Sequence, residues 1–190
     1  MRIIDFNSSS FRGFPNEEKI LVDTGMIYAY YNRYDAYHQT VKDFFDTYVF
    51  GNDESVVFLF VNPTIINEIV NLAQKPLQQY LKAYPHETAN FTEADIVAVR
   101  DTIMANVRDL IKDDVINVID GTRDSALLQI DITNTLGAAD AVNASIAHLY
   151  SLSFLTVDKR LVNNMKTVRS QISNIDSVYY TEPKHREYFT

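Results

Sequence analysis

The chain has 190 residues, 46% of them apolar, which suits one domain with a sizeable core rather than two domains. It contains no Cys, which excludes disulfides and thiolate metal sites and is typical of a cytoplasmic protein. No apolar run approaches the roughly 20 residues that span a bilayer, and residues 1–15 lack the apolar stretch of a signal peptide, so we expect no membrane association. The net charge of −8 disfavours a nucleic-acid ligand, because proteins that neutralise phosphates are usually basic.

Positive charge is nevertheless concentrated near the end of the chain. Residues 159–190 hold six basic and three acidic residues, a local charge of +3, so the remainder carries −11. Lys159 and Arg160 open this segment directly after Asp158. We predict that both contact a phosphate backbone, although a lysine at a helix start is more often only solvated.

The predicted elements alternate between strands and helices along the chain. The first half is predicted to contain a polar extension at 1–18, a strand at 19–23, helices at 24–32 and 36–48, a buried strand at 56–61, and a helix from Pro63 that breaks near Pro76. The second half is predicted to contain a helix from Thr92, a strand at 115–119, a short helix at 123–128, a helix at 140–149, and strands at 154–157 and, as an edge, 178–181.

Strands separated by helices predict an α/β fold with a central, mostly parallel sheet of four to five strands, covered on both faces. There is no internal repeat, low-complexity tract or Pro/Gly-rich linker, so we expect residues 19–190 to form a single domain. Within that domain, residues 76–114 form a helical excursion.

Four carboxylates stand at or within apolar stretches of these elements. Asp23 and Asp158 each follow a run of apolar β-formers, so each should lie at the carboxyl end of a strand, where open α/β sheets build their ligand crevices. Asp140 opens a helix with one apolar face, and Glu68 lies inside a helix rich in Ile. If they converge, these carboxylates repel one another unless a cation neutralises them, and Mg²⁺ or Mn²⁺ is the natural occupant because such ions prefer oxygen ligands.

Each carboxylate taken alone has a simpler interpretation. Asp23, Asp140 and Asp158 all stand at helix starts, where each could be an N-cap. Glu68 alone would more often be a solvated surface charge. The joint occurrence of the four favours the metal site.

Several neighbouring residues are candidates for a supporting role. Thr24 and Thr156 could hold the carboxylates or a metal-bound water by hydrogen bonds, and Asn143 lies one helical turn after Asp140. The four His residues show no metal-ligand spacing and receive no role. The run of Tyr28, Tyr30, Tyr31, Tyr34 and Tyr37 could stack on unpaired bases, but rings at helical spacing more often pack in a core.

The chain resembles the PIN-domain ribonucleases, which include the VapC-type toxins, over about residues 18 to 165. Four segments in order carry the resemblance: KILVDTGMIYAYYN, PTIINEIVNL, DAVNASIAHL and Thr156-Val157-Asp158. They match the family's metal-site acids to Asp23, Glu68, Asp140 and Asp158. Each motif alone is weak, whereas all four in order are quite specific.

The resemblance implies a PIN-like α/β/α sandwich and a Mg²⁺- or Mn²⁺-dependent endoribonuclease that hydrolyses RNA phosphodiester bonds. Asp23, Glu68, Asp140 and Asp158 would be its catalytic and metal-binding residues, and Lys159 and Arg160 would bind RNA. It further implies a toxin inhibited by an antitoxin protein, and a homodimer.

Other functions stay open beside it. A PIN-like module could bind RNA or protein without cutting, and a housekeeping nuclease could process RNA without being a toxin. A phosphohydrolase with an Asp nucleophile is disfavoured, because Gly25 stands where its second Asp would be.

Overall fold

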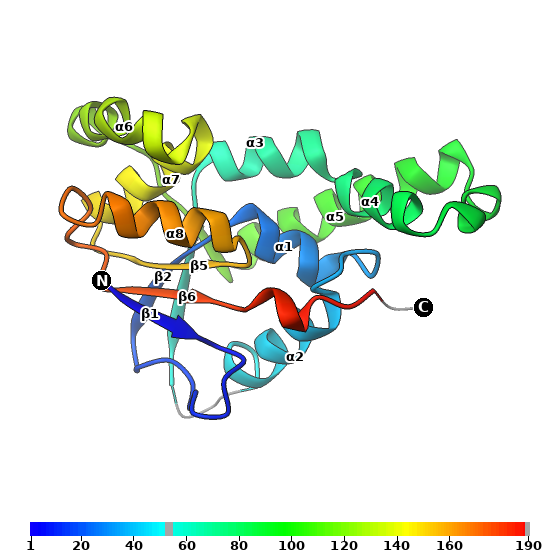
Figure 1. Ribbon diagram of the computed structural model, residues 1–190, viewed down its shortest axis with the longest axis horizontal. Helices are drawn as coiled ribbons and strands as arrows, with labels where there is room; N and C mark the ends of the chain where they lie inside the picture. Colours follow the sequence, from blue (N-terminus) through cyan, green and yellow to red (C-terminus); the bar gives the residue numbers. More distant parts are fainter. Residues whose placement is uncertain (52–54, 189–190) are drawn as a thin grey trace.

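The computed structural model describes residues 1–51 and 55–188 and shows an α/β protein with one sheet of six parallel strands (Figure 1). The strands are β1 (Arg2–Asp5), β2 (Glu18–Val22), β3 (Val57–Val61), β4 (Ile116–Val118), β5 (Ser153–Thr156) and β6 (Ser177–Tyr180). The helices are α1 (Thr24–Tyr31), α2 (His38–Tyr48), α3 (Pro63–Leu72), α4 (Lys75–Ala83), α5 (Glu93–Lys112), α6 (Arg123–Leu136), α7 (Ala138–Leu149) and α8 (Lys159–Thr167), with short 3-10 helices η1 (Pro85–Asn90) and η2 (Pro183–His185).

The sheet order is β1-β6-β5-β2-β3-β4. From β2 the chain moves outward to β3 and β4, and it then returns to place β5 and β6 on the other side of β2. The direction of winding therefore changes between the neighbouring strands β2 and β5. In open parallel sheets ligands bind at such a switch point, outside the carboxyl ends of the strands.

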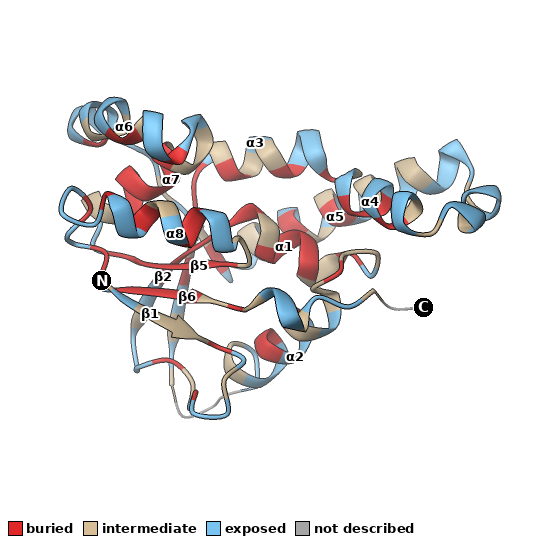
Figure 2. Cartoon of the chain, in the orientation of Figure 1, coloured by how far each residue is buried: buried red, intermediate tan, exposed pale blue. Residues whose placement is uncertain are grey.

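Helices lie on both faces of the sheet, with α7 and α8 above β5 and β6 in Figure 1 and α2 below them. Burial follows this arrangement: β5, β6 and the second half of β2 are almost entirely buried, whereas η1 and the outer side of α6 carry mostly exposed residues (Figure 2). Strands covered on both faces need apolar side chains in succession, as in Ile20, Leu21 and Val22. Among residues 1–51 and 55–188, no helix is long and apolar enough to cross a membrane.

The α/β class and a parallel sheet are confirmed, but the sheet has six strands instead of the predicted four to five. The prediction that residues 178–181 form an edge strand is wrong, because β1 pairs with β6 on its outer side. β1 has only four residues and no fully buried side chain, so its sequence carries little strand signal. Residues 1–18, predicted as a polar extension, thus contribute a strand to the sheet.

The same N-terminal segment also contributes to the core. Phe6, Phe11 and Phe14 are buried and pack around Phe44 of α2, with ring centroids 4.2, 5.9 and 5.4 Å from it. Phe14 also lies edge-on to Tyr179 of β6 at 4.8 Å. Buried aromatic pairs of this kind contribute both apolar area and favourable ring geometry. The segment is therefore held by packing as well as by strand pairing.

Helix boundaries near the predicted acids differ in two places from the sequence prediction. The helix predicted at 123–128 continues to Leu136, and Gly137, at φ +94°, then separates α6 from α7. A positive φ of this size favours glycine, which explains why the break falls there. As a result α7 begins at Ala138, and Asp140 lies in its first turn instead of opening it.

The excursion between β3 and β4 consists of α4, η1 and α5. The predicted break near Pro76 is confirmed, since α3 ends at Leu72 and Pro76 stands in the first turn of α4, where its missing N–H is not needed. At Thr92 the predicted helix start is confirmed by a capping box with Asp95.

Candidate functional site

The switch point of the sheet carries a buried carboxylate. Asp23 directly follows β2, and its backbone N–H donates to the Leu155 carbonyl of β5 at 2.9 Å. Its side chain is 8% exposed and accepts a hydrogen bond of 2.6 Å from the Thr156 hydroxyl. Asp23 occupies the N-cap position of α1, yet its side chain makes no capping hydrogen bond. The N-cap interpretation therefore does not account for this carboxylate.

Two residues of α1 hold Glu68 in position by hydrogen bonds. The Thr24 hydroxyl donates to Glu68 Oε2 at 2.7 Å, and the Tyr28 hydroxyl donates to the Glu68 backbone carbonyl at 2.6 Å. Thr24 and Tyr28 are both buried, whereas Glu68 is half-buried. These bonds join α3 to α1 and fix the turn of α3 that carries the glutamate.

Asp158 behaves differently from Asp23. It is the N-cap of α8, and its Oδ1 accepts from the backbone N–H groups of Arg160 at 2.7 Å and Leu161 at 3.1 Å. The N-cap interpretation is thus confirmed for this residue. Its own backbone N–H donates to the Thr156 hydroxyl at 2.9 Å, so Thr156 links Asp158 to Asp23.

The four predicted acids line one open cavity of about 670 Å³ at the carboxyl ends of β2 and β5. Asp23 and Asp158 come from the strand ends, Glu68 from α3 and Asp140 from the first turn of α7. Thr24, Gly25 and Tyr28 of α1 line its floor with Asp23. The fold thus brings acids that are up to 135 residues apart in the sequence, Asp23 and Asp158, to a single cavity.

Burial and the neighbouring carboxylates raise the pKa of two of these acids, Asp23 and Asp140. The pKa of Asp23 is raised from 3.8 to about 7, mainly because burial disfavours its charge, and further by Asp140, Glu68 and Asp158, while the Thr156 hydrogen bond opposes the change. The pKa of Asp140 is raised to about 6 by burial and by Asp158 and Glu68, against Arg160. The acids therefore form one electrostatic unit that favours a cation or a proton.

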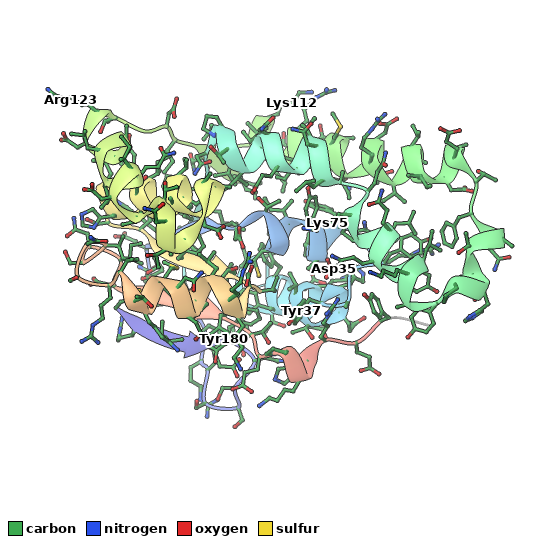
Figure 3. All side chains as sticks on the ribbon, turned by 45° about the horizontal axis from the view of Figure 1, so that its top comes forward. Asp35, Tyr37, Lys75, Lys112, Arg123 and Tyr180 are labelled. Carbon is green, nitrogen blue, oxygen red and sulfur yellow. The ribbon has the colours of Figure 1, made fainter. Side chains whose placement is uncertain are left out.

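Four cations surround the acids in the same cavity: Lys75, Lys159, Arg160 and Arg186. Figure 3 shows Lys75 near Asp35 and Tyr37, which also line the cavity, whereas Lys112 and Arg123 lie at the periphery of the molecule. Within residues 1–51 and 55–188, none of these four side chains has a carboxylate oxygen within 4.0 Å. They are accordingly available to a phosphate, and Lys159 and Arg160 are exposed as that role requires.

Sequence reasoning missed Lys75 and Asp35, named Tyr37 only as a possible stacking residue, and included Arg186 only as part of the basic segment. Asp35 and Tyr37 stand in the segment between α1 and α2, and the pKa of Asp35 is raised by burial, against its hydrogen bond from the Tyr37 N–H and the nearby Arg186. None of these residues follows an apolar strand, so no strand-end pattern marks them. Arg186 belongs to the predicted basic segment, and that local charge was the one available signal.

The supporting residues fall into two groups. Thr24 and Thr156 hydrogen-bond the predicted acids, as described above. Asn143 is instead fully buried, and its Oδ1 accepts from Asn62, the N-cap of α3, at 2.8 Å. Among the described residues its Nδ2 has no hydrogen-bond partner. The Asn143–Asn62 bond therefore joins α7, which carries Asp140, to α3, which carries Glu68.

The donor set is suited to a hydrated divalent cation rather than to a closed metal cage. In the part of the chain that the structure describes, no three His, Asp or Glu side chains are arranged to hold a metal ion together. Mg²⁺ usually binds through one or two carboxylates and keeps several waters, so carboxylates that line an open cavity fit it. Asp23 and Asp140, whose pKa values are raised by burial and by neighbouring carboxylates, are the candidates for direct ligands.

No known family profile matches this chain, and no curated protein sequence matches it.

A pH-dependent stability follows from the raised pKa of Asp23. A folded pKa above the unfolded one means that the folded state binds the extra proton, so stability is lost as pH rises from about 4 to about 7. Asp23→Asn removes this loss while keeping an acceptor for Thr156. In EDTA, urea unfolding should show the variant more stable than the parent above pH 7, by up to about 4 kcal/mol, and no more stable at pH 4.

The matched control is Asp131→Asn, which changes an exposed helical acid outside the cavity and should not alter the pH profile. The raised pKa of Asp23 would be contradicted if the difference in stability between the parent and the Asp23→Asn variant were the same at pH 4 and at pH 8.

Proposed function

We propose that the protein is a Mg²⁺- or Mn²⁺-dependent ribonuclease that hydrolyses phosphodiester bonds in single-stranded RNA. The observation that carries this proposal is the gathering of Asp23, Glu68, Asp140 and Asp158 around one cavity at the switch point of the sheet. Four carboxylates can hold a metal ion, and the unpaired cations around them can hold an anion. The cavity therefore suits a phosphodiester, which would bind both the metal ion and the cations. When bound, the metal supplies Lewis-acid polarisation of a phosphoryl oxygen.

The residues of the chain divide the remaining work between them. Thr24 holds Glu68 and Thr156 holds Asp23, so the carboxylates keep one orientation toward the cavity. Lys75 and Arg186, from α4 and the C-terminal segment, lie on the cavity wall with Lys159 and Arg160 of α8. In this proposal they bind the non-bridging oxygens of the phosphates and orient the strand across the acids.

The resemblance to PIN-domain ribonucleases supports RNA as the substrate. The four matching segments carry the acids that line the cavity, and a parallel sheet flanked by helices is compatible with the sandwich that the resemblance implies. Single-stranded RNA is favoured because unpaired segments are the regions in which a protein reaches the backbone and the bases together. A toxin role, an inhibitory partner protein and a homodimer stay predictions of the resemblance.

The cleavage assay tests the metal-site assignment directly. The parent should cut a labelled single-stranded RNA in Mg²⁺ or Mn²⁺ and not in EDTA. Asp23→Asn and Asp140→Asn should each lower the rate by more than about 100-fold, since loss of even an outer-shell partner of a metal ligand costs 10- to 100-fold. Circular dichroism should show both variants folded, and Asp131→Asn should cut like the parent. If both site variants cut as fast as the parent, the assignment is wrong.

The cations on the cavity wall make a separate prediction about binding. The test measures how the RNA association constant falls with salt in an Asp23→Asn background. Replacing Lys75 and Arg186 by Ala should make the negative slope of log K against log salt shallower by about 1.4, roughly 0.7 for each lost contact with single-stranded RNA. Replacing Lys159 and Arg160 should have a similar effect. Lys112→Ala, on an exposed part of α5 away from the cavity, serves as the control. Unchanged slopes in both double variants would place the RNA path elsewhere.

A further inference from the structure

A second cavity of about 700 Å³ lies beside the acidic one and has a different chemistry. It is open to solvent and is lined by the end of α1, the segment that follows it, α4, η1 and the first half of α5. Its aromatic wall is formed by Tyr31, Tyr34, Tyr80 and Phe91. None of these residues belongs to the four acidic motifs of the chain, apart from Tyr31 in the segment that carries Asp23.

The rings of this wall are held in position by one another. The Tyr34 ring lies 5.3 Å from that of Tyr80 and 5.2 Å from that of Phe91, the latter edge-on. The Arg33 guanidinium lies 4.9 Å from the centre of the Tyr34 ring and donates to its hydroxyl at 2.7 Å. Tyr34 and Phe91 are only half-buried, so part of each ring stays open to a ligand. A planar ring entering the cavity would find prepositioned stacking partners.

The cavity also contains a buried donor without a partner. Asn32 lines it and is 2% exposed, and its Oδ1 accepts from the Tyr34 N–H at 3.0 Å. Among the described residues, Nδ2 of Asn32 has no hydrogen-bond partner. A buried amide that donates to nothing is costly and is rare in folded proteins. A ring carrying a carbonyl oxygen or a ring nitrogen would offer this amide the acceptor that it lacks.

The charges around this cavity favour a base over a phosphate. Glu87 and Asp95 line it, and Arg33 is the one cation among its described lining residues. Two carboxylates repel a phosphate, but they accept hydrogen bonds from the amino groups of nucleobases. Asn90, whose amide donates to Glu87 at 2.8 Å, adds a further polar group on the same side.

The two cavities share their walls. Residues 31–34 line the second cavity and residues 35–37 line the acidic one, so the same short segment separates them. On α4, Gln79 faces the acidic cavity and Tyr80 the second. Arg186 of the acidic cavity stacks over Tyr188 at 5.8 Å, and Tyr188 in turn lies 5.8 Å from Tyr80. A strand whose phosphate lies among the acids would carry a neighbouring base to this wall.

We propose that the second cavity binds an unpaired nucleobase of the RNA strand whose backbone lies in the acidic cavity. The base stacks on Tyr34 and Phe91, and an acceptor atom on it pairs with Asn32. This inference rests on the proposed function for the identity of the strand. It assigns a role to the excursion 76–114, which supplies Tyr80, Phe91 and the acidic rim.

Binding to an inactive variant tests the proposal without requiring cleavage. In an Asp23→Asn background with EDTA, fluorescence anisotropy would compare a labelled eight-nucleotide single-stranded RNA with the same backbone made of abasic riboses. The RNA with bases should bind at least about tenfold more tightly, the effect of one stacked base. Tyr34→Leu and Phe91→Leu should each remove most of that difference and leave binding of the abasic strand unchanged. Asn32→Ser, which keeps an uncharged acceptor for the Tyr34 N–H but removes the amide donor, should weaken only the strand with bases.

Tyr150→Leu is the matched control, because Tyr150 is 43% exposed at the end of α7 and lies outside both cavities. Equal loss of both strands in the Tyr34 and Phe91 variants, or no loss in either, would overturn the proposal. Free AMP, GMP, CMP or UMP binding as tightly as the eight-nucleotide RNA would overturn the assignment to a strand. These outcomes are independent of the cleavage assay. A parent that does not cut RNA but still binds the strand with bases more tightly would contradict the proposed ribonuclease and not the base site.

Discussion

One buried carboxylate, at the point where the winding of the sheet reverses, determines the arrangement of the site. Asp23 follows β2 directly, makes no helix-capping bond, and depends on the Thr156 hydroxyl of the neighbouring strand. Its surroundings disfavour its charge, so the site favours the uptake of a proton or a cation. The local packing is correspondingly close: a Cβ on Gly25 would lie 3.0 Å from Val157, so glycine allows α1 to start tightly against the end of β5. The position of α1 then fixes Thr24, and through it Glu68.

Opposite charges are distributed at different depths around that carboxylate. The acids lie on the inner surface of the cavity, whereas Lys159 and Arg160 are exposed at its edge and Lys75 and Arg186 approach from α4 and the C-terminal segment. This separation explains how a chain with a net charge of −8 can present a local surface for a polyanion. The negative charge is concentrated where a divalent cation would neutralise it, and unpaired positive charge remains where phosphates would pass. In our proposal the second cavity adds an aromatic stacking surface to the same path.

The sequence predicted those parts of the fold that have a strong local pattern. Apolar runs ending in a carboxylate revealed β2 and β5, and hence Asp23 and Asp158, because burial on both faces imposes such runs. β1 escaped prediction because its pairing with β6 depends on residues 175 positions away. The core contribution of the segment that follows β1 escaped as well, because it comes from three Phe residues scattered through a polar stretch. Lys75 escaped because a residue on a cavity wall needs no periodic pattern, and Arg186 was marked only by the local positive charge of its segment. The sequence also could not show that Asp158 caps α8 while Asp23 caps nothing, since both stand at the same position relative to a strand and a helix.

The central claim is that the gathered carboxylates form a cation site, and direct measurement of metal binding tests it most simply. Mn²⁺ titrated into the metal-free protein at pH 7.5 can be followed by the electron paramagnetic resonance signal of the free ion. The account predicts saturable binding by the parent and by Asp131→Asn, and binding weakened at least about tenfold in Asp140→Asn. A parent that binds no Mn²⁺, or an Asp140→Asn variant that binds it as tightly as the parent does, would contradict the account.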